Sequence, residues 1–340
     1  MVYRGYIGTY SKGENGGIFR FKFDDGRFSA EPACGVENPS FLCFAGEGML
    51  AVSETSEYEG ENGGSLAYIE IHKDGQEMKL IEKSRKATSG KDPCYVDCVE
   101  YKGKIRAFSA NYSEGTASMF EIENGELSEC VKTIVHTGSG KDPARQEMAH
   151  IHCTVITPDK KYAAVCDLGT DKIAFYDLKG NPVSEVQLPA GSGPRHIVFK
   201  EEYAYAVTEL SSEIYAYTYE DGRLSEIGSY PLLPEGFSGF SNAAAIKISP
   251  DGKFLAASNR GHNSLAVFRF AGKGRLDFVC RRAVEGDFPR DFAFTPDSQW
   301  ILCANQLSED ITVFKVNQGI PEFTGIKYRL PKPVMILFDK

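Results

Sequence analysis

The 340-residue sequence contains no apolar run of the roughly 18 residues that a membrane-spanning helix needs. It also lacks an amphipathic pattern of helical period that continues for a dozen residues. The segment Met1–Tyr6 has no long apolar stretch like that of a secretory signal, and the nine cysteines include no Cys-x-x-Cys pair. These absences exclude a transmembrane helix and a coiled coil. They predict a cytoplasmic protein with free thiols.

What the chain does contain is typical of a globular protein. Hydrophobic residues make up 42% of it, aromatic residues 12% and charged residues 25%, which is enough apolar material for a sizeable core. The 47 acidic residues outnumber the 38 basic ones, for a net charge of −9. This charge disfavours nucleic acid and anionic membranes as partners, although a local cationic cleft is compatible with it.

A short pattern recurs seven times along the whole chain: an apolar stretch ends in a small residue, a polar residue and a variable one. Consecutive copies end 42 to 58 residues apart, and the distance from the last copy through the chain end to the first is 44. Between the copies lie alternating strands that run into glycine turns, such as Ile18–Phe23 before Asp25-Gly26. The copies are Gly8–Tyr10, Val52–Glu54, Ala110–Tyr112, Cys166–Leu168, Thr208–Leu210, Ser258–Arg260 and Ala304–Gln306.

Short strands at this period predict an all-β fold, a seven-bladed β-propeller with four strands in each blade. We expect Pro333–Phe338 to supply the inner strand of the last blade and Tyr3–Phe23 to supply the rest, which closes the ring. Length alone favours two domains, and a pair of β-sandwiches is the alternative. Because the seven spacings use up the chain once around a ring, we predict one domain over residues 1–340.

The repeat also predicts where a site lies. Antiparallel strands bring the start of the first strand and the end of the second to the same face of a blade, beside the central channel. One column at this mouth follows the Pro or Ala that opens each inner strand: Ser40, Cys94, His150, Arg195, Ala244, Arg290 and Val334. The other column is the polar residue of the repeated pattern: Thr9, Ser53, Asn111, Asp167, Glu209, Asn259 and Asn305.

Charged and ionisable residues concentrate in the third to sixth blades. Guanidinium groups bind carboxylate or phosphate in bidentate fashion, and a carboxylate or imidazole among them can exchange a proton. The cluster therefore predicts a site for a small anion. Its members are His150, His152, Asp167, Arg195, His196, Glu209, Arg260 and Arg290.

Several residues of this cluster have a structural alternative. Asp167 can cap a turn, and His152 can be a hydrogen-bonded core histidine. His150 and His152 with Asp167 form only a weak metal motif. Gly138–Lys141 resembles the end of a phosphate-binding loop but lacks its first glycine and its final serine or threonine. No Gly-x-Ser-x-Gly elbow indicates a serine hydrolase.

Seven segments carry a family resemblance in the same order along the chain. They are Arg145–His152, Asp167–Asp171, Gly191–His196, Glu209-Leu210, Ser249–Gly252, Ser258–His262 and Pro289–Phe292. Together they resemble the seven-bladed lactonase family, which includes bacterial propeller-type 6-phosphogluconolactonases and a fungal muconate-lactonizing enzyme. The resemblance implies a cytoplasmic hydrolase that opens a sugar-acid lactone, 6-phosphogluconolactone of the pentose phosphate pathway above all, without cofactor or metal.

The same resemblance implies roles for individual residues. The expected catalytic residues are His150, Glu209, Arg195 and Arg260. Glu209 or His150 would act as the general base, and the two arginines would stabilise the oxyanion or hold the negative group of the substrate. The expected substrate-binding residues are Arg145, His152, Asp167, His196, Arg290 and Gln306, with Arg145 and Arg290 as candidates for the phosphate.

Two departures from the family pattern bear on the activity. Ala149 stands where the family usually has proline, and Ala245 stands where a glutamate is common. Two other functions compatible with a propeller are a cycloisomerase that joins a carboxylate to a double bond and a non-catalytic scaffold for a protein partner. The arginine cluster argues against the scaffold, since a docking face does not need such a concentration of charge.

Overall fold

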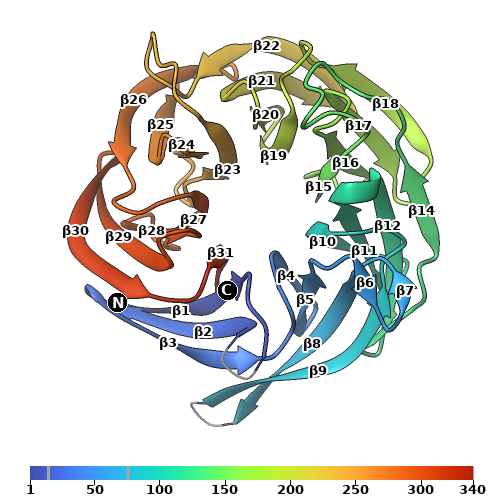
Figure 1. Cartoon of the computed structure of the whole chain (residues 1–340). Helices are drawn as coiled ribbons and strands as arrows, with labels where there is room; N and C mark the ends of the chain where they lie inside the picture. Colours follow the sequence, from blue (N-terminus) through green and yellow to red (C-terminus); the bar gives the residue numbers. More distant parts are fainter. Residues whose placement is uncertain (14–15, 75–76, 340) are drawn as a thin grey trace.

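The computed structural model describes residues 1–13, 16–74 and 77–339 of the chain. In these ranges it has strands and one short 3₁₀ helix, Tyr112–Glu114, and no α-helix. Seven antiparallel sheets stand around a central channel like the blades of a propeller, as the sequence predicted (Figure 1). Among the described residues no helix is long and apolar enough to span a membrane.

Six of the blades run in chain order from their inner strand to their outer strand, and the seventh combines the two ends of the chain. The first blade is β4 (Leu42–Ala45), β5 (Gly48–Ser53), β8 (Ser65–Asp74) and β9 (Glu77–Ala87), and a hairpin of β6 (Glu57–Tyr58) and β7 (Glu61–Asn62) follows β5. The second is β10 (Pro93–Tyr101), β11 (Lys104–Asn111), β12 (Thr116–Glu123), β13 (Glu126–Leu127) and β14 (Lys132–Val135). The third is β15 (Ile151–Ile156), β16 (Tyr162–Asp167), β17 (Lys172–Asp177) and β18 (Pro182–Gln187).

The remaining blades follow the same plan. The fourth is β19 (Pro194–Lys200), β20 (Tyr203–Thr208), β21 (Glu213–Glu220) and β22 (Arg223–Pro231). The fifth is β23 (Asn242–Ile248), β24 (Phe254–Arg260), β25 (Ser264–Phe270) and β26 (Leu276–Ala283). The sixth is β27 (Pro289–Phe294), β28 (Trp300–Asn305), β29 (Asp310–Asn317) and β30 (Ile320–Arg329). The seventh is β31 (Pro333–Phe338), β1 (Val2–Thr9), β2 (Ile18–Asp24) and β3 (Arg27–Cys34).

The core lies between the blades. Seven apolar clusters fill the seven interfaces between neighbouring sheets. Because each blade is covered on both faces, its second strand is a nearly continuous small or apolar run, as in Gly48–Ser53, where every residue is buried. The outer strands face water on one side and alternate, as in β18.

The two ends of the chain close the ring. Tyr6 of β1 pairs with Leu337 of β31, and Ile7 pairs with Ile336, which confirms the predicted shared blade. Across the interface between the sixth and seventh blades, the rings of Phe23 and Trp300 meet edge to face with centroids 5.2 Å apart. The closure is therefore stabilised by backbone pairing within one sheet and by aromatic packing against the next.

A β-bulge recurs near the channel end of the inner strands. In β10, Pro93 pairs with Asn111 and Tyr95 with Ala110, so Cys94 has no residue opposite it. A bulge kinks the strand and redirects a side chain, and such kinks are common beside active sites. The corresponding extra residues in other blades are His152, Arg195, Ala244 with Ala245, Arg290 and Val334.

Candidate active site

The bulges determine which residues reach the channel. They correct one position in each of the two predicted columns. In β15 the extra residue is His152, so His152 rather than His150 corresponds to Cys94 and Arg195. In β20 the residue opposite Pro194 is Thr208, so Glu209 lies one position beyond the predicted column. The column positions expected for His150 and Glu209 were therefore wrong. Ala149 does not mark the strand start as the prolines of other blades do, because β15 begins at Ile151.

The polar column at the end of each second strand holds the blade together. Asn111 donates from Nδ2 to the hydroxyls of Thr116 and Ser118, and Asn305 donates to Asp310 and Thr312. These hydrogen bonds tie the second strand to the third within one sheet. These side chains of the column therefore have a structural role: they point into the blade and link its second and third strands.

Asp167 is the most heavily bonded member of this column. Its Oδ1 accepts from the backbone N–H groups of His150, Gly169 and Thr170, and its Oδ2 lies 2.8 Å from Nδ1 of His136. Burial alone would raise the pKa of Asp167, but the hydrogen bonds from His136 and Thr170 outweigh it and lower the pKa. Both oxygens of Asp167 are engaged by the fold around the turn that follows β16.

In several blades the residue after the column position contacts a bulge residue instead. The ring of Tyr10 lies under the Arg290 guanidinium, 4.9 Å from centroid to Cζ, and Tyr112 meets His152 edge to face. Sequence reasoning missed Tyr10, Glu54 and Tyr112 as site residues. The signal was present in the repeat, one position after the polar residue.

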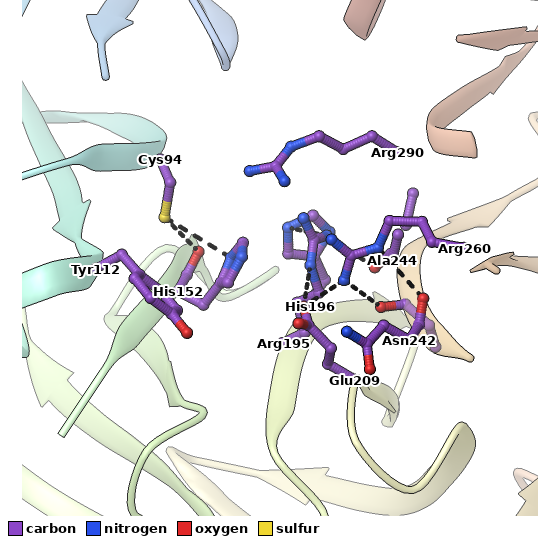
Figure 2. A network of polar contacts seen from close by, with 12 residues as sticks. Cys94, Tyr112, His152, Arg195, His196, Glu209, Asn242, Ala244, Arg260 and Arg290 are labelled. Atoms are coloured by element: carbon purple, nitrogen blue, oxygen red, sulfur yellow. Dashed lines mark hydrogen bonds and ion pairs between the residues drawn. The ribbon is translucent and has the colours of Figure 1, made fainter. Parts of the chain in front are cut away.

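Glu209 is the centre of an arginine cluster (Figure 2). Its Oε2 lies 2.9 Å from Nε of Arg195 and 2.6 Å from Nη2 of Arg260, and its Oε1 lies 2.5 Å from Nη2 of Arg145. Burial would raise the pKa of Glu209, but the three guanidinium groups outweigh it and hold the pKa well below its ordinary range. Two blades, the fourth and the fifth, and the loop between β14 and β15 thus meet on a single carboxylate.

The arginines of this cluster are also held by backbone carbonyls. Arg195 donates from Nη1 to the carbonyl of Ala244, and Arg260 donates to the carbonyls of Asn242 and Ala243. Burial lowers the pKa of Arg260 to about 10, so the group stays protonated at neutral pH. Arg145 comes from the loop between β14 and β15 and also donates to the hydroxyl of Tyr112.

Arg290 differs from the other three. Its nearest carboxylate oxygen, Oε1 of Glu54, is 3.8 Å away, and its guanidinium makes no hydrogen bond to any described residue. In Figure 2 its side chain lies apart from the bonded groups, above His152 and Arg260, and no dashed line reaches it. It lines a small cavity of about 10 Å³ together with Ser40, Cys94, Arg195, His196 and Val334, among others. The cavity has room for about one water, so a larger ligand has to bind nearer the mouth.

The three histidines of the site, His150, His152 and His196, are all buried, but their partners differ. Burial, reinforced by the charge of Arg195, holds the pKa values of His152 and His196 well below the ordinary value, so both rings are neutral at pH 7. Nδ1 of His152 lies 3.7 Å from the thiol of Cys94, whose own pKa burial raises well above its ordinary value. His150 stacks on Tyr112 and has a partner at each ring nitrogen, the Tyr112 carbonyl at 2.9 Å and Glu147 at 3.2 Å.

Comparison with known proteins places this geometry in a family. The model of the family described as lactonase, 7-bladed β-propeller, matches residues 4–338. The chain belongs to this lactonase family. It is 34% identical to 6-phosphogluconolactonase of Bacillus subtilis, over 99% of this chain and 98% of that protein.

Two solved structures show how well the lactonase fold is matched. A periplasmic gluconolactonase of Pseudomonas aeruginosa superimposes with a TM-score of 0.90 at 32% identity, covering 99% of both chains. A protein from Lactobacillus plantarum has a TM-score of 0.89 at 32% identity, covering both chains completely. The similarity extends over the whole ring, including the strands that close it.

The charges of this lactonase-family site favour an anionic ligand. Four arginines, Arg145, Arg195, Arg260 and Arg290, face two carboxylates, Glu54 and Glu209. The excess positive charge lies in a protein whose net charge is −9. A buried cationic centre of this kind can hold a negative group or stabilise one that forms during a reaction.

Metal binding has little support in the same part of the molecule. The described residues include no group of three or more His, Cys, Asp or Glu side chains arranged to hold a metal ion. The weak His150-x-His152 motif needed Asp167 as a third ligand, and Asp167 bonds to His136 and to backbone amides instead. Gln306, the last expected substrate-binding residue, follows the end of β28 and is half-buried.

Proposed function

We propose that the protein hydrolyses the ester bond of a negatively charged sugar-acid lactone, with 6-phosphogluconolactone as its substrate. The observation that carries the proposal is the guanidinium of Arg290, which lies at the channel without a hydrogen-bond acceptor among the described residues. Names of relatives support the substrate class, since they include a 6-phosphogluconolactonase and a gluconolactonase. We also propose the cytoplasm as its location, although the Pseudomonas relative is described as periplasmic.

In this proposal the four arginines have two different roles, stabilisation of the oxyanion and binding of the phosphate. Water attack on the lactone carbonyl places negative charge on its oxygen, and preorganised donors that face this oxygen lower the barrier. Arg195 and Arg260 are held rigidly by Glu209 and by backbone carbonyls, so they are suited to the oxyanion. Arg290 has free N–H groups for the phosphate, and Arg145 at the rim is suited to assist it.

His152 is the general base in this scheme. The sequence resemblance pointed to Glu209 or His150, but both oxygens of Glu209 are occupied by three arginines. His150 has both ring nitrogens engaged. His152 is buried, neutral at pH 7 and adjacent to the cluster, so its imidazole is suited to take a proton from the attacking water. Glu209 then acts as a positioning residue for the arginines.

The experiment is a pH-stat assay over a panel of substrates, with the uncatalysed rate subtracted. The panel contains 6-phosphogluconolactone, glucono-δ-lactone and δ-valerolactone, and cis,cis-muconate tests for cyclisation. We expect the phosphorylated lactone to be hydrolysed best. Arg290→Met should raise its KM at least tenfold and change the KM of glucono-δ-lactone much less.

Arg223→Met is the matched control, because Arg223 is an exposed arginine on the outer strand β22. It should behave like the wild type. Absence of proton release with every lactone in folded protein would refute the hydrolase. Turnover of muconate alone would assign the cycloisomerase instead.

A further inference from the structure

A second cluster of polar residues lies beside the channel, where the sixth, seventh and first blades meet. The hydroxyl of Tyr10 donates to Oε1 of Glu54 at 2.7 Å, and Arg290 lies 3.8 Å from the same oxygen. Tyr10 also stacks on Arg290. One oxygen of Glu54 is therefore fixed by the protein, and the direction of the carboxylate is set.

The other oxygen of Glu54 is buried and has no hydrogen-bond partner among the described residues. The same is true of the hydroxyl of Ser40, whose residue is 4% exposed and lines the channel cavity beside Arg290. Unpaired buried polar atoms are costly, and a native protein normally satisfies them with a ligand or with ordered water.

The chemistry of these atoms indicates what kind of ligand group satisfies them. An ionised carboxylate only accepts hydrogen bonds, and a serine hydroxyl can accept as well. The matching groups are donors without positive charge, because Arg290 already supplies a cation beside Glu54. Hydroxyl groups of a polyol fit this description, whereas muconate has none.

We propose that Glu54, oriented by Tyr10, forms with Ser40 on the two sides of Arg290 a hydroxyl-binding subsite that selects polyhydroxylated lactones. In this arrangement the arginines around Glu209 bind the negative groups of the substrate, and Glu54 accepts hydrogen bonds from its hydroxyl groups. This inference rests on the proposed lactonase function for the identity of the substrate, but binding tests it separately from hydrolysis.

The test is isothermal titration of two ligands that the enzyme does not turn over. 6-Phosphogluconate carries the hydroxyl groups, and 6-phosphohexanoate has the same chain length, carboxylate and phosphate without them. We expect the wild type to bind 6-phosphogluconate at least tenfold more tightly. Glu54→Gln replaces the unpaired acceptor with a donor and should reduce the ratio of the two dissociation constants to less than threefold.

The ratio of the two dissociation constants is the readout, because the electrostatic effect of removing the charge of Glu54 changes the affinity for both anions equally and leaves their ratio unaffected. Glu57→Gln is the control, since Glu57 is exposed on the hairpin strand β6, and it should keep the wild-type ratio. Thermal melting checks that both variants fold. Tyr10→Phe, which removes the hydrogen bond that orients Glu54, should reduce the ratio in the same direction.

The outcomes separate the two proposals. Equal binding of both ligands by the wild type, no binding of 6-phosphogluconate, or an unchanged ratio in Glu54→Gln would overturn the subsite, and the polar atoms would then hold water only. Hydrolysis of lactones with an unchanged ratio would leave the proposed function standing alone. A ratio that depends on Glu54 without hydrolysis of any lactone would support the subsite and refute the hydrolase.

Discussion

Nε of Arg195 lies 2.9 Å from Oε2 of Glu209, and each of these side chains is only 2% exposed. A charge pair removed from water to this extent depends on both partners, since breaking a buried pair leaves an uncompensated charge that costs about 3–5 kcal/mol. Because Arg260 and Arg145 contact the same carboxylate, Glu209 organises three cations at once. This dependence leads to the first two predictions.

Replacement of Glu209 by glutamine should lower kcat/KM for the lactone at least a hundredfold. The amide keeps the shape of the side chain but removes the charge that holds Arg195 and Arg260 in place. Arg195→Met should have a loss of similar size. Initial rates measure both, and Glu220→Gln, an exposed change at the end of β21, is the control. Near-normal rates in folded variants would remove these residues from the mechanism.

The stability of the protein toward acid should depend on Glu209. The pKa of this carboxyl is well below its ordinary range in the folded protein, whereas the unfolded chain takes up the proton near pH 4.3, roughly the ordinary value for glutamate. The contribution of Glu209 to stability is therefore present above about pH 5 and declines as the pH falls toward 3.

Urea unfolding at several pH values measures this contribution. The free energy of unfolding of the wild type should exceed that of Glu209→Gln most at pH 6 to 7, and the difference should shrink as the pH decreases below 5. A difference that stays constant or grows on acidification would contradict the assignment.

The acid limb of the kcat/KM profile should lie below pH 6.5. Burial and Arg195 hold the pKa of His152 below that value, so the neutral base persists into mildly acidic solution. His152→Asn should lose about 100-fold or more in kcat, and His150→Asn should lose clearly less. A limb at pH 6.5 or above would contradict His152 as the base, and a larger loss in His150→Asn would transfer that role to His150.

Asp167→Asn should weaken the fold more than the chemistry. The substitution disturbs an oxygen pair that accepts three backbone N–H groups and faces His136. We expect a loss of about 1–3 kcal/mol in the free energy of unfolding and a kcat within threefold of the wild type. A large rise in KM at unchanged stability would instead support the substrate-binding role expected from the resemblance.

Removal of the last eight residues should open the ring. Pro333–Phe338 form the inner strand of the seventh blade, and without β31 the edge of β1 and the aromatic packing near Phe338 are exposed. We expect loss of cooperative unfolding and association during size-exclusion chromatography. Restoration by the separately added peptide would show that strand pairing is the cause, and a monomeric truncated protein that unfolds cooperatively would contradict the closure argument.

The sequence by itself determined the number of blades, the closure of the ring and the presence of arginines at one mouth of the channel. Strand alternation and turn residues are local signals, and the spacing of a repeat is unaffected by how the blades pack. The resemblance named the family for the same reason, since each of its motifs is a short continuous segment of the chain.

Only the tertiary structure decided which side chains meet. Bulges in six of the inner strands redirect side chains toward the channel. A shift of one or two positions therefore separates His152 from His150 and Glu209 from Thr208. The pairing of Arg145 with Glu209, and of Tyr10 with Glu54, joins blades and loops far apart in the chain. These contacts depend on register and on packing between blades, which no local pattern of residues specifies.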